Sequence, residues 1–120
     1  MTKITHRSKL KNKKIVITGG SGFIGSHLLS SLLDKNKICV IDNEYRGSNL
    51  DYVEKKYPTY YKKNVQLEKC DIRDKEKILE IFKEFEPEIV FHLAAFAGVK
   101  TILNDPLQVI NVNSIGCYNL

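Results

Sequence analysis

Apolar residues follow two different periods along the chain, and the change of period separates strands from helices. Short β-branched or alternating apolar runs predict strands over residues 14–18, 37–41, 65–70 and 89–95. Apolar residues that recur every three or four positions predict helices over 23–34, around 50–57, up to about 85 and from near 106 onward. The rest of the stretch from 44 to 64, including Pro58, is expected to form loops.

The predicted order of elements is β-α-β-α-β-α-β-α, which indicates parallel strands with helices on both faces. Right-handed crossovers leave few arrangements, and the doubly wound order 3-2-1-4 fits. The fold class is therefore α/β: a Rossmann-type doubly wound parallel sheet, incomplete, with its first four strands. Asp71 or Asp74 is expected to cap the third helix. The fourth strand would lie at an edge with unpaired backbone groups, so the isolated chain is expected to be poorly soluble.

Composition adds few constraints: 120 residues, 42% hydrophobic, with a formal net charge of +5. Six basic residues and no acid lie in the first fourteen positions, which favours a solvated tail over a nucleic-acid-binding arm. No membrane span or secretory signal is visible, so neither nucleic acid nor membrane is expected as a partner. Three cysteines without a C-x-x-C pair favour a cytoplasmic location, and the three histidines are too far apart to predict a metal site.

A glycine-rich turn, TGGSGFIG over residues 18–25, lies between the first predicted strand and helix. Gly19 or Gly20, together with Gly22 and Gly25, fits the spacing that allows a tight turn, close approach to a pyrophosphate and close helix packing. An ordinary glycine-rich turn is the alternative for the motif alone. Asp42 closes the next strand, near the position at which an acid binds the adenosine ribose. A carboxylate there favours NAD over NADP, although Arg46 nearby keeps NADP as an alternative.

Further segments resemble one family: TGGSGFIGSHL (18–28), IDN (41–43), CDIRD (70–74), HLAA (92–95), AGVK (97–100), NDP (104–106) and N-x-x-G (113–116). In this order they resemble the extended short-chain dehydrogenase/reductase family, and within it the NAD-dependent nucleotide-sugar epimerases and dehydratases. The resemblance covers nearly the whole chain after the tail. On this basis residues 1–13 are expected to be the basic tail, and residues 14–120 the N-terminal part of an NAD-binding Rossmann domain, truncated before any substrate domain.

The resemblance implies a role for each matching position. Gly19, Gly22, Phe23, Ile24 and Gly25 would line the pyrophosphate, and Asp42 and Asn43 would meet the ribose. The adenine would lie by Asp71 and Ile72, the nicotinamide side by Leu93, Ala94 and Ala95, and the sugar-nucleotide pocket by Gly98, Val99 and Lys100. Two alternatives remain open from the residues themselves: Ile72 as plain core, and His92 as a hydrogen-bonded residue at a strand end.

In this family NAD takes a hydride from the sugar, leaving a transient 4-keto sugar, with a Tyr-x-x-x-Lys pair placed after a fifth strand. No catalytic residue is assigned in this chain, which is expected to be inactive alone. Tyr52-x-x-x-Lys56 matches the motif's letters but precedes the third strand, so these residues are interpreted as an exposed helix face. Nearby Tyr57, Tyr60 and Tyr61 are interpreted as local packing.

The leading interpretation is the NAD-binding portion of a nucleotide-sugar 4-epimerase of the UDP-glucuronate or UDP-N-acetylglucosamine type. The full-length protein is expected to be a homodimer that binds a nucleotide-sugar substrate. One alternative is a fragment of a sugar-nucleotide 4,6-dehydratase or decarboxylase. Another is a non-catalytic NAD-binding module that needs a partner chain.

Overall fold

The computed structural model describes residues 10–44, 48–94 and 107. Strands and helices alternate through this part of the chain as the sequence pattern predicts, except that two consecutive helices lie between the second and third strands. The elements are β1 (Lys14–Thr18), α1 (Phe23–Leu32), β2 (Lys37–Asp42), α2 (Leu50–Lys56), α3 (Pro58–Asn64), β3 (Val65–Lys69), α4 (Lys75–Phe85) and β4 (Ile89–His92). The helix predicted from near Pro106 falls almost entirely outside the described residues.

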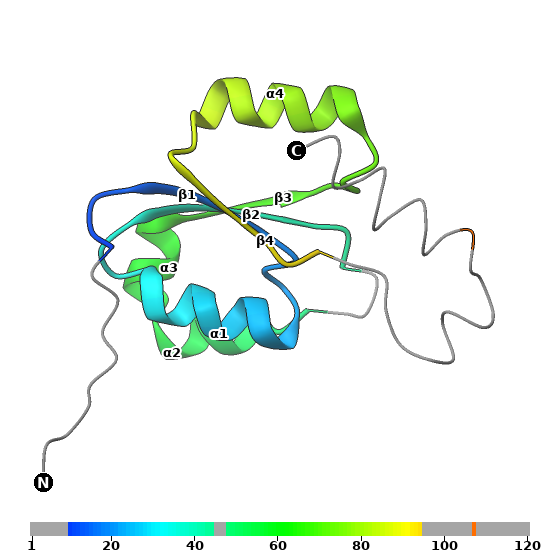
Figure 1. The fold of residues 1–120 in the computed structure, drawn as a ribbon. Coiled ribbons are helices and arrows are strands. Elements are labelled where there is room, and N and C mark those ends of the chain that lie inside the picture. Colours follow the sequence, from blue (N-terminus) through cyan, green and yellow to red (C-terminus); the bar gives the residue numbers. More distant parts are fainter. Residues whose placement is uncertain (1–9, 45–47, 95–106, 108–120) are drawn as a thin grey trace, which may run out of the picture.

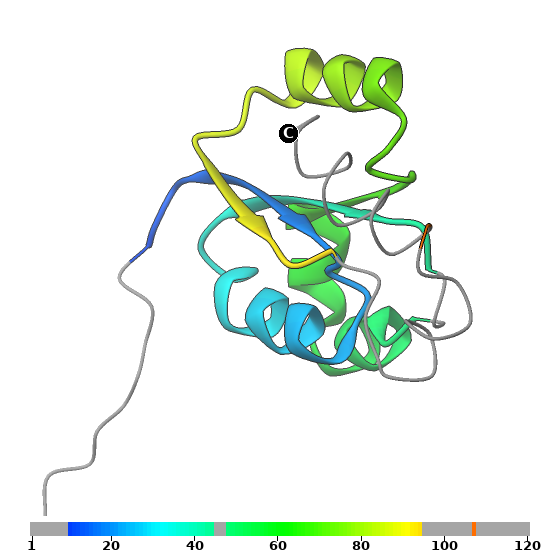
Figure 2. The same cartoon turned by 45° about the vertical axis from the view of Figure 1, so that its right-hand side comes forward.

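The strands form one parallel sheet in the order β3-β2-β1-β4. This confirms the predicted doubly wound order and the α/β class. Helix α4 covers one face of the sheet, while α1, α2 and α3 lie on the other (Figures 1 and 2). In a parallel sheet the carboxyl ends of all strands meet at one edge, so β1, β2 and β4 bring the turn after β1, Asp42 and His92 to the same edge.

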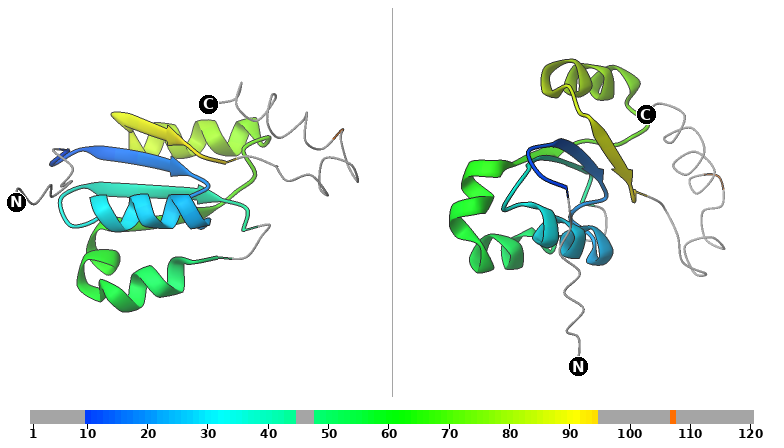
Figure 3. Two further views of the ribbon diagram at one scale, coloured as in Figure 1. Left: turned by 60° about the horizontal axis from the view of Figure 1, so that its bottom comes forward. Right: turned by 60° about the vertical axis from the view of Figure 1, so that its left-hand side comes forward.

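The core consists of two clusters separated by the sheet. Ile15 and Ile17 of β1 pack with α1 and α2, whereas Val16 faces the cluster that contains Ile78 and Ile81 of α4. This alternation follows from the period of two along a strand, and it explains why β1 is apolar at every buried position before Thr18. Figure 3 shows α1 lying along the sheet on the face opposite α4. Among the described residues, no helix is long and apolar enough to span a membrane.

The prediction of a loop around Pro58 was wrong, because α3 begins at that residue. Proline is tolerated in the first helical turn, since its missing N–H would have no partner there and its φ is already helical. The amphipathic signal was weak because α3 buries no residue completely. Tyr57 and Tyr61 pack against the core cluster beneath it, in agreement with a local packing role.

Strand β4 is shorter than predicted and ends at His92 instead of residue 95. Its neighbour β1 ends at Thr18, where the chain turns away into the glycine segment, so no ladder partner exists for a longer strand. Val90 remains 40% exposed because β4 lies at an edge of the described sheet. Of the two proposed caps for α4, Asp74 is the one used: it accepts a hydrogen bond from the Lys77 amide.

Cys39 and Cys70 are free, buried thiols, as their apolar surroundings predict. Burial, assisted by the Glu68 charge, raises the pKa of Cys39 to about 12. Alkylation proceeds through the thiolate, so we expect iodoacetamide at pH 8 to modify Cys39 at least about a hundredfold more slowly in the folded chain than in urea. Peptide mass spectrometry over time measures this. Equal rates in both states would contradict the burial of β2.

Candidate functional site

The glycine-rich turn joins β1 to α1 at the carboxyl edge of the sheet. The Gly19 amide donates a hydrogen bond to the Ile41 carbonyl at 2.8 Å, and the Gly22 amide donates to the Gly19 carbonyl at 3.1 Å. Gly19 has a φ of 72°, in the left-handed region that strains other residues. The turn is therefore fixed to the end of β2 by a hydrogen bond, and the chain reverses direction at Gly19 through a backbone conformation that favours glycine.

Two glycines of the turn lie too close to backbone atoms to carry a side chain. A Cβ on Gly19 would lie 2.8 Å from the Ala94 nitrogen. A Cβ on Gly25 would overlap the Gly19 carbonyl oxygen and lie 2.7 Å from the Gly20 Cα. Gly22 differs, since its nearest contact would be at 3.3 Å. Gly19 and Gly25 thus allow backbone-to-backbone packing, whereas Gly22 leaves the turn open.

Helix α1 starts with an open, positively polarised end. Its N-cap residue is Gly22, which provides no side-chain cap, and its first turn contains no acid. Amides in a first helical turn lack intrahelical partners and lie at the positive end of the helix dipole. The side chains of Phe23 and Ile24 are 74% and 70% exposed. This end of α1 is therefore suited to an anion whose neighbouring groups are apolar or aromatic.

Asp42, the predicted ribose ligand, contacts the glycine turn directly. Its Oδ2 accepts a hydrogen bond from the Ser21 amide at 3.0 Å, and its Oδ1 accepts one from the Glu44 amide at 2.6 Å. A carboxylate oxygen can accept two hydrogen bonds, so each retains a position for a hydroxyl donor. Asn43 is exposed beside it. The structure thus places the predicted ribose and pyrophosphate residues side by side.

Asp71 and Ile72, which are predicted to lie by the adenine, follow β3, and unlike Asp42 neither has a side chain that is open to a ligand. The side chain of Ile72 is buried in the core on the α4 side, as the plain-core alternative expected. The Asp71 carboxylate accepts hydrogen bonds from the Arg73 backbone amide and guanidinium, including one of 2.6 Å from Nη2. The side-chain hydrogen bonds from Arg73 lower the pKa of Asp71. Since these four contacts fill the carboxylate, Arg73 must move before Asp71 can accept from an adenine amino group.

Replacing Arg73 with Ala is expected to raise the pKa of Asp71, because the guanidinium is the largest cause of its depression. Carboxyl ¹³C NMR during a pH titration measures it. In the wild type the pair stabilises the fold above the unfolded pKa of about 3.9, and this contribution is lost as pH falls through the folded pKa. The effect on unfolding is small because both side chains are about one-third exposed. Lys75→Ala is the control, and an unchanged Asp71 pKa in Arg73→Ala would contradict the pairing.

The exit of β4 forms the other wall of the site. His92 lies opposite Thr18 at the end of β1, with 2.7 Å between Nδ1 and Oγ1. Thr18 is fully buried, and burial lowers the pKa of His92. The amides of Leu93 and Ala94 donate to Thr18 Oγ1 at 3.0 and 3.1 Å. His92 is therefore a hydrogen-bonded residue at a strand end, which was the alternative that the sequence left open for it. The same threonine oxygen holds Leu93 and Ala94 beside the glycine turn.

The sequence pattern did not single out Thr18 or Ser21. Only a weak signal existed for Thr18: it ends the predicted first strand, and His92 lies within the predicted fourth strand, which the predicted order places beside the first. Ser21 gave no such signal, since its contact with Asp42 depends on the conformation of the turn. The Ser21 hydroxyl is buried and has no hydrogen-bond partner within the described part of the chain.

Several predicted residues lie outside the described ranges, namely Ala95, Gly98, Val99, Lys100 and Arg46. The Tyr52-x-x-x-Lys56 segment is described, and it is an exposed face of α2, as predicted: Tyr52 is 61% exposed. The Lys56 ammonium lies 5.8 Å from the Tyr52 ring centroid and 5.5 Å from that of Tyr57. These residues therefore pair with one another on the surface. Within residues 10–44, 48–94 and 107, no cluster of three or more His, Cys, Asp or Glu could hold a metal ion.

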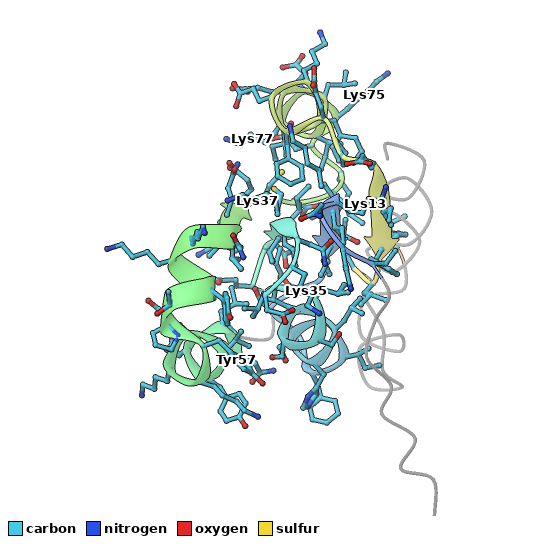
Figure 4. All side chains as sticks on the ribbon, turned by 90° about the vertical axis from the view of Figure 1, so that its left-hand side faces the viewer. Lys13, Lys35, Lys37, Tyr57, Lys75 and Lys77 are labelled. Atoms are coloured by element: carbon cyan, nitrogen blue, oxygen red, sulfur yellow. The ribbon has the colours of Figure 1, made fainter. Side chains whose placement is uncertain are left out.

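Lysines gather away from the glycine turn, near the amino ends of β1 and β2. Figure 4 shows Lys13, Lys35 and Lys37 in this region. Lys13 forms an ion pair with Glu88, with 3.5 Å between the charged atoms, and the Lys37 ammonium donates to the Lys63 carbonyl at 3.0 Å. At the carboxyl edge, Lys69 ends β3 and Arg73 follows it, and they pair with Glu44 and Asp71, so in the described part of the chain the positive polarity beside the glycine turn comes from backbone amides and the α1 dipole.

A parallel sheet of order 3-2-1-4, a glycine turn opening the first helix and an acid ending the second strand together define the dinucleotide-binding half of a Rossmann protein. The family model described as "GDP-mannose 4,6 dehydratase" matches residues 16–120. The chain belongs to this family, within the extended short-chain dehydrogenases/reductases that include nucleotide-sugar epimerases and dehydratases.

Known proteins with related sequences include the UDP-N-acetyl-alpha-D-glucosaminuronate decarboxylase of Bacillus cytotoxicus, 35% identical over 90% of this chain and 32% of that protein. The UDP-glucose 4-epimerase of Thermus thermophilus, solved with NAD, is 37% identical with a TM-score of 0.74, over 88% of this chain and 32% of that one. The UDP-N-acetylglucosamine 4-epimerase of Methanobrevibacter ruminantium is 35% identical with a TM-score of 0.73, over 92% of this chain and 33% of that one. The chain thus spans about a third of the length of these relatives.

Proposed function

We propose that these residues form the NAD-binding part of a nucleotide-sugar 4-epimerase. The observation that carries the proposal is the link between Asp42 and the Ser21 amide, which places an acid beside the open N-terminus of α1. An acid at this point favours a free ribose 2′-hydroxyl and disfavours a 2′-phosphate, so NAD is preferred to NADP.

The described residues fit the two halves of the adenosine diphosphate group. The pyrophosphate would lie against Gly19, Gly22, Phe23, Ile24 and Gly25, where the amides of the last three, in the first turn of α1, have no intrahelical partner. The ribose would bind Asp42 and Asn43, and the adenine would lie by Asp71 and Ile72. Leu93 and Ala94 would border the nicotinamide side, followed by Ala95. When bound, NAD would supply a reversible hydride acceptor for the sugar.

The substrate proposal extends to the whole protein, with Gly98, Val99 and Lys100 beside a sugar nucleotide of the UDP-glucuronate or UDP-N-acetylglucosamine type. It is supported by the similarity to solved UDP-sugar 4-epimerases. A 4,6-dehydratase or a decarboxylase is the second candidate, favoured by the family description and by the relative from B. cytotoxicus. We further propose a cytoplasmic homodimer, and no turnover by the 120-residue chain alone.

Isothermal titration calorimetry of the 120-residue chain with NAD and with NADP tests the cofactor proposal. We expect NAD to bind and NADP to bind more weakly. Absence of NAD binding by a chain whose circular dichroism shows it to be folded would overturn the proposal. The full gene product, incubated with each UDP-sugar, separates the candidates: a 4-epimer supports the epimerase, a 4-keto-6-deoxy sugar the dehydratase and released carbon dioxide the decarboxylase.

In the described part of the sheet, β4 has no neighbouring strand on one side, which favours one other candidate, an NAD-binding module completed by a partner chain. A strand edge with unpaired backbone groups readily pairs with another strand. Co-purification of the tagged chain with a protein that supplies further parallel strands would support this candidate. Recovery of a monomeric chain that binds NAD on its own would contradict it.

A further inference from the structure

The carboxyl ends of β1 and β4 are joined by a compact hydrogen-bond network around one hydroxyl. Thr18 and His92 are register partners in the sheet, and Thr18 Oγ1 lies 2.7 Å from His92 Nδ1. The same oxygen lies 3.0 Å from the Leu93 nitrogen and 3.1 Å from the Ala94 nitrogen. The Leu93 amide is shared, because it also donates to the Thr18 carbonyl at 3.0 Å.

Counting protons fixes the direction of each bond. A threonine hydroxyl has one hydrogen to donate and two acceptor positions. The amides of Leu93 and Ala94 can only donate, so they occupy both acceptor positions of Thr18 Oγ1. The hydroxyl hydrogen is then directed at His92 Nδ1, which must be the unprotonated nitrogen of the ring. A protonated Nδ1 would present a third donor to an oxygen that has no position left.

This network controls the spacing between the two walls of the site. Ala94 is the residue whose nitrogen would lie 2.8 Å from a Cβ on Gly19, so the β4 exit and the glycine turn are in direct backbone contact. A rotation of the Thr18 hydroxyl would release the Ala94 amide at that contact. The acceptor on His92 prevents this rotation, because it gives the hydroxyl hydrogen a fixed partner.

We propose that His92 is a positioning residue for the cofactor site: as an Nε2-protonated, neutral ring, it orients the Thr18 hydroxyl so that Leu93 and Ala94 are held against the phosphate turn. The inference depends on the proposed function only in its consequence for NAD. The desolvated position of the ring agrees with the neutral form, since burial lowers the pKa of His92 by disfavouring the charged imidazolium.

Nitrogen NMR of the ¹⁵N-histidine-labelled 120-residue chain at pH 7.5 tests the tautomer without any ligand. We expect the His92 Nδ1 signal at the position of an unprotonated nitrogen and the Nε2 signal at that of a protonated one. His6 and His27 provide reference signals in the same sample, and Thr18→Val assigns the effect of the hydroxyl. A His92 ring protonated at Nδ1, or charged at this pH, would overturn the proposal whether or not NAD binds.

Two variants of His92, one that keeps a hydrogen-bond acceptor and one that lacks it, test whether the network holds the residues of the site in place. Asn carries an acceptor on Cγ, as His does at Nδ1, whereas Leu has a similar size and no acceptor. We therefore expect His92→Asn to keep slow hydrogen exchange of the Ala94 amide and His92→Leu to speed it up on the order of tenfold, the size of one lost hydrogen bond. NAD affinity should follow the same order. Equal exchange in the two variants would refute a positioning role, whereas failure of the wild type to bind NAD would count only against the proposed function.

Discussion

Gly25→Ala is expected to destabilise the chain by about 3 kcal/mol, although the substitution lies within a helix, where Ala is normally preferred to Gly by about 1 kcal/mol. The reason is contact with backbone and not with a flexible side chain. A Cβ at this position would overlap the Gly19 carbonyl oxygen and lie 2.7 Å from the Gly20 Cα. Relief requires α1 to move away from the turn, which exposes the apolar face that α1 packs on the sheet. Urea unfolding followed by circular dichroism measures the change.

Gly22→Ala is the matched control, because its Cβ would meet only the Gly19 carbonyl oxygen at 3.3 Å. We expect this variant to lose less than about 1 kcal/mol of unfolding free energy. It should nevertheless weaken NAD binding, because the new methyl group lies where the pyrophosphate is proposed to approach. Similar stability losses in the two variants would show that Gly25 has no special packing role. A stabilised Gly25→Ala chain would show that the turn and helix are further apart than described.

Asp42→Ala is expected to weaken NAD binding by roughly ten- to a hundredfold, as hydrogen bonds to a charged group contribute about 1.5–3 kcal/mol. The carboxylate accepts from the Ser21 amide and the Glu44 amide, so its removal also frees the turn that is proposed to hold the pyrophosphate. Removing the negative charge should reduce the preference for NAD over NADP, because the repulsion of a 2′-phosphate disappears. Calorimetric titration with both cofactors gives the two affinities.

Asp34→Asn changes the net charge by the same amount at an exposed position beyond the carboxyl end of α1, away from the turn. Its affinities for NAD and NADP should equal those of the wild type. Asp42→Asn retains one acceptor oxygen and should fall between the wild type and Asp42→Ala. If Asp42→Ala bound NAD as the wild type does, the ribose would have to lie elsewhere, and the assignment of Asp42 would be wrong.

Local sequence determined the elements with strong periodicity. The β-branched run in β1 and the three- and four-residue spacing in α1 and α4 each predicted the element found, because these segments bury one face or both. The segment from Pro58 to Asn64 was not predicted as a helix, since α3 buries nothing completely and so carries no apolar period. The length of β4 was overestimated, because a strand ends where its neighbour leaves it and not where its apolar residues end.

The order of the strands, the glycine turn and the acid at the end of β2 could all be predicted from the amino-acid sequence. Each of these depends on residue type and chain order, and right-handed crossovers leave few arrangements, of which the doubly wound order fits. Which atoms meet at the site depends instead on how the strands pair and how the backbone turns between them. Thr18 and His92 are far apart in the chain, and their contact follows from the pairing of β1 with β4. The same holds for Gly19 against Ala94, whose approach depends on backbone geometry that no local pattern encodes.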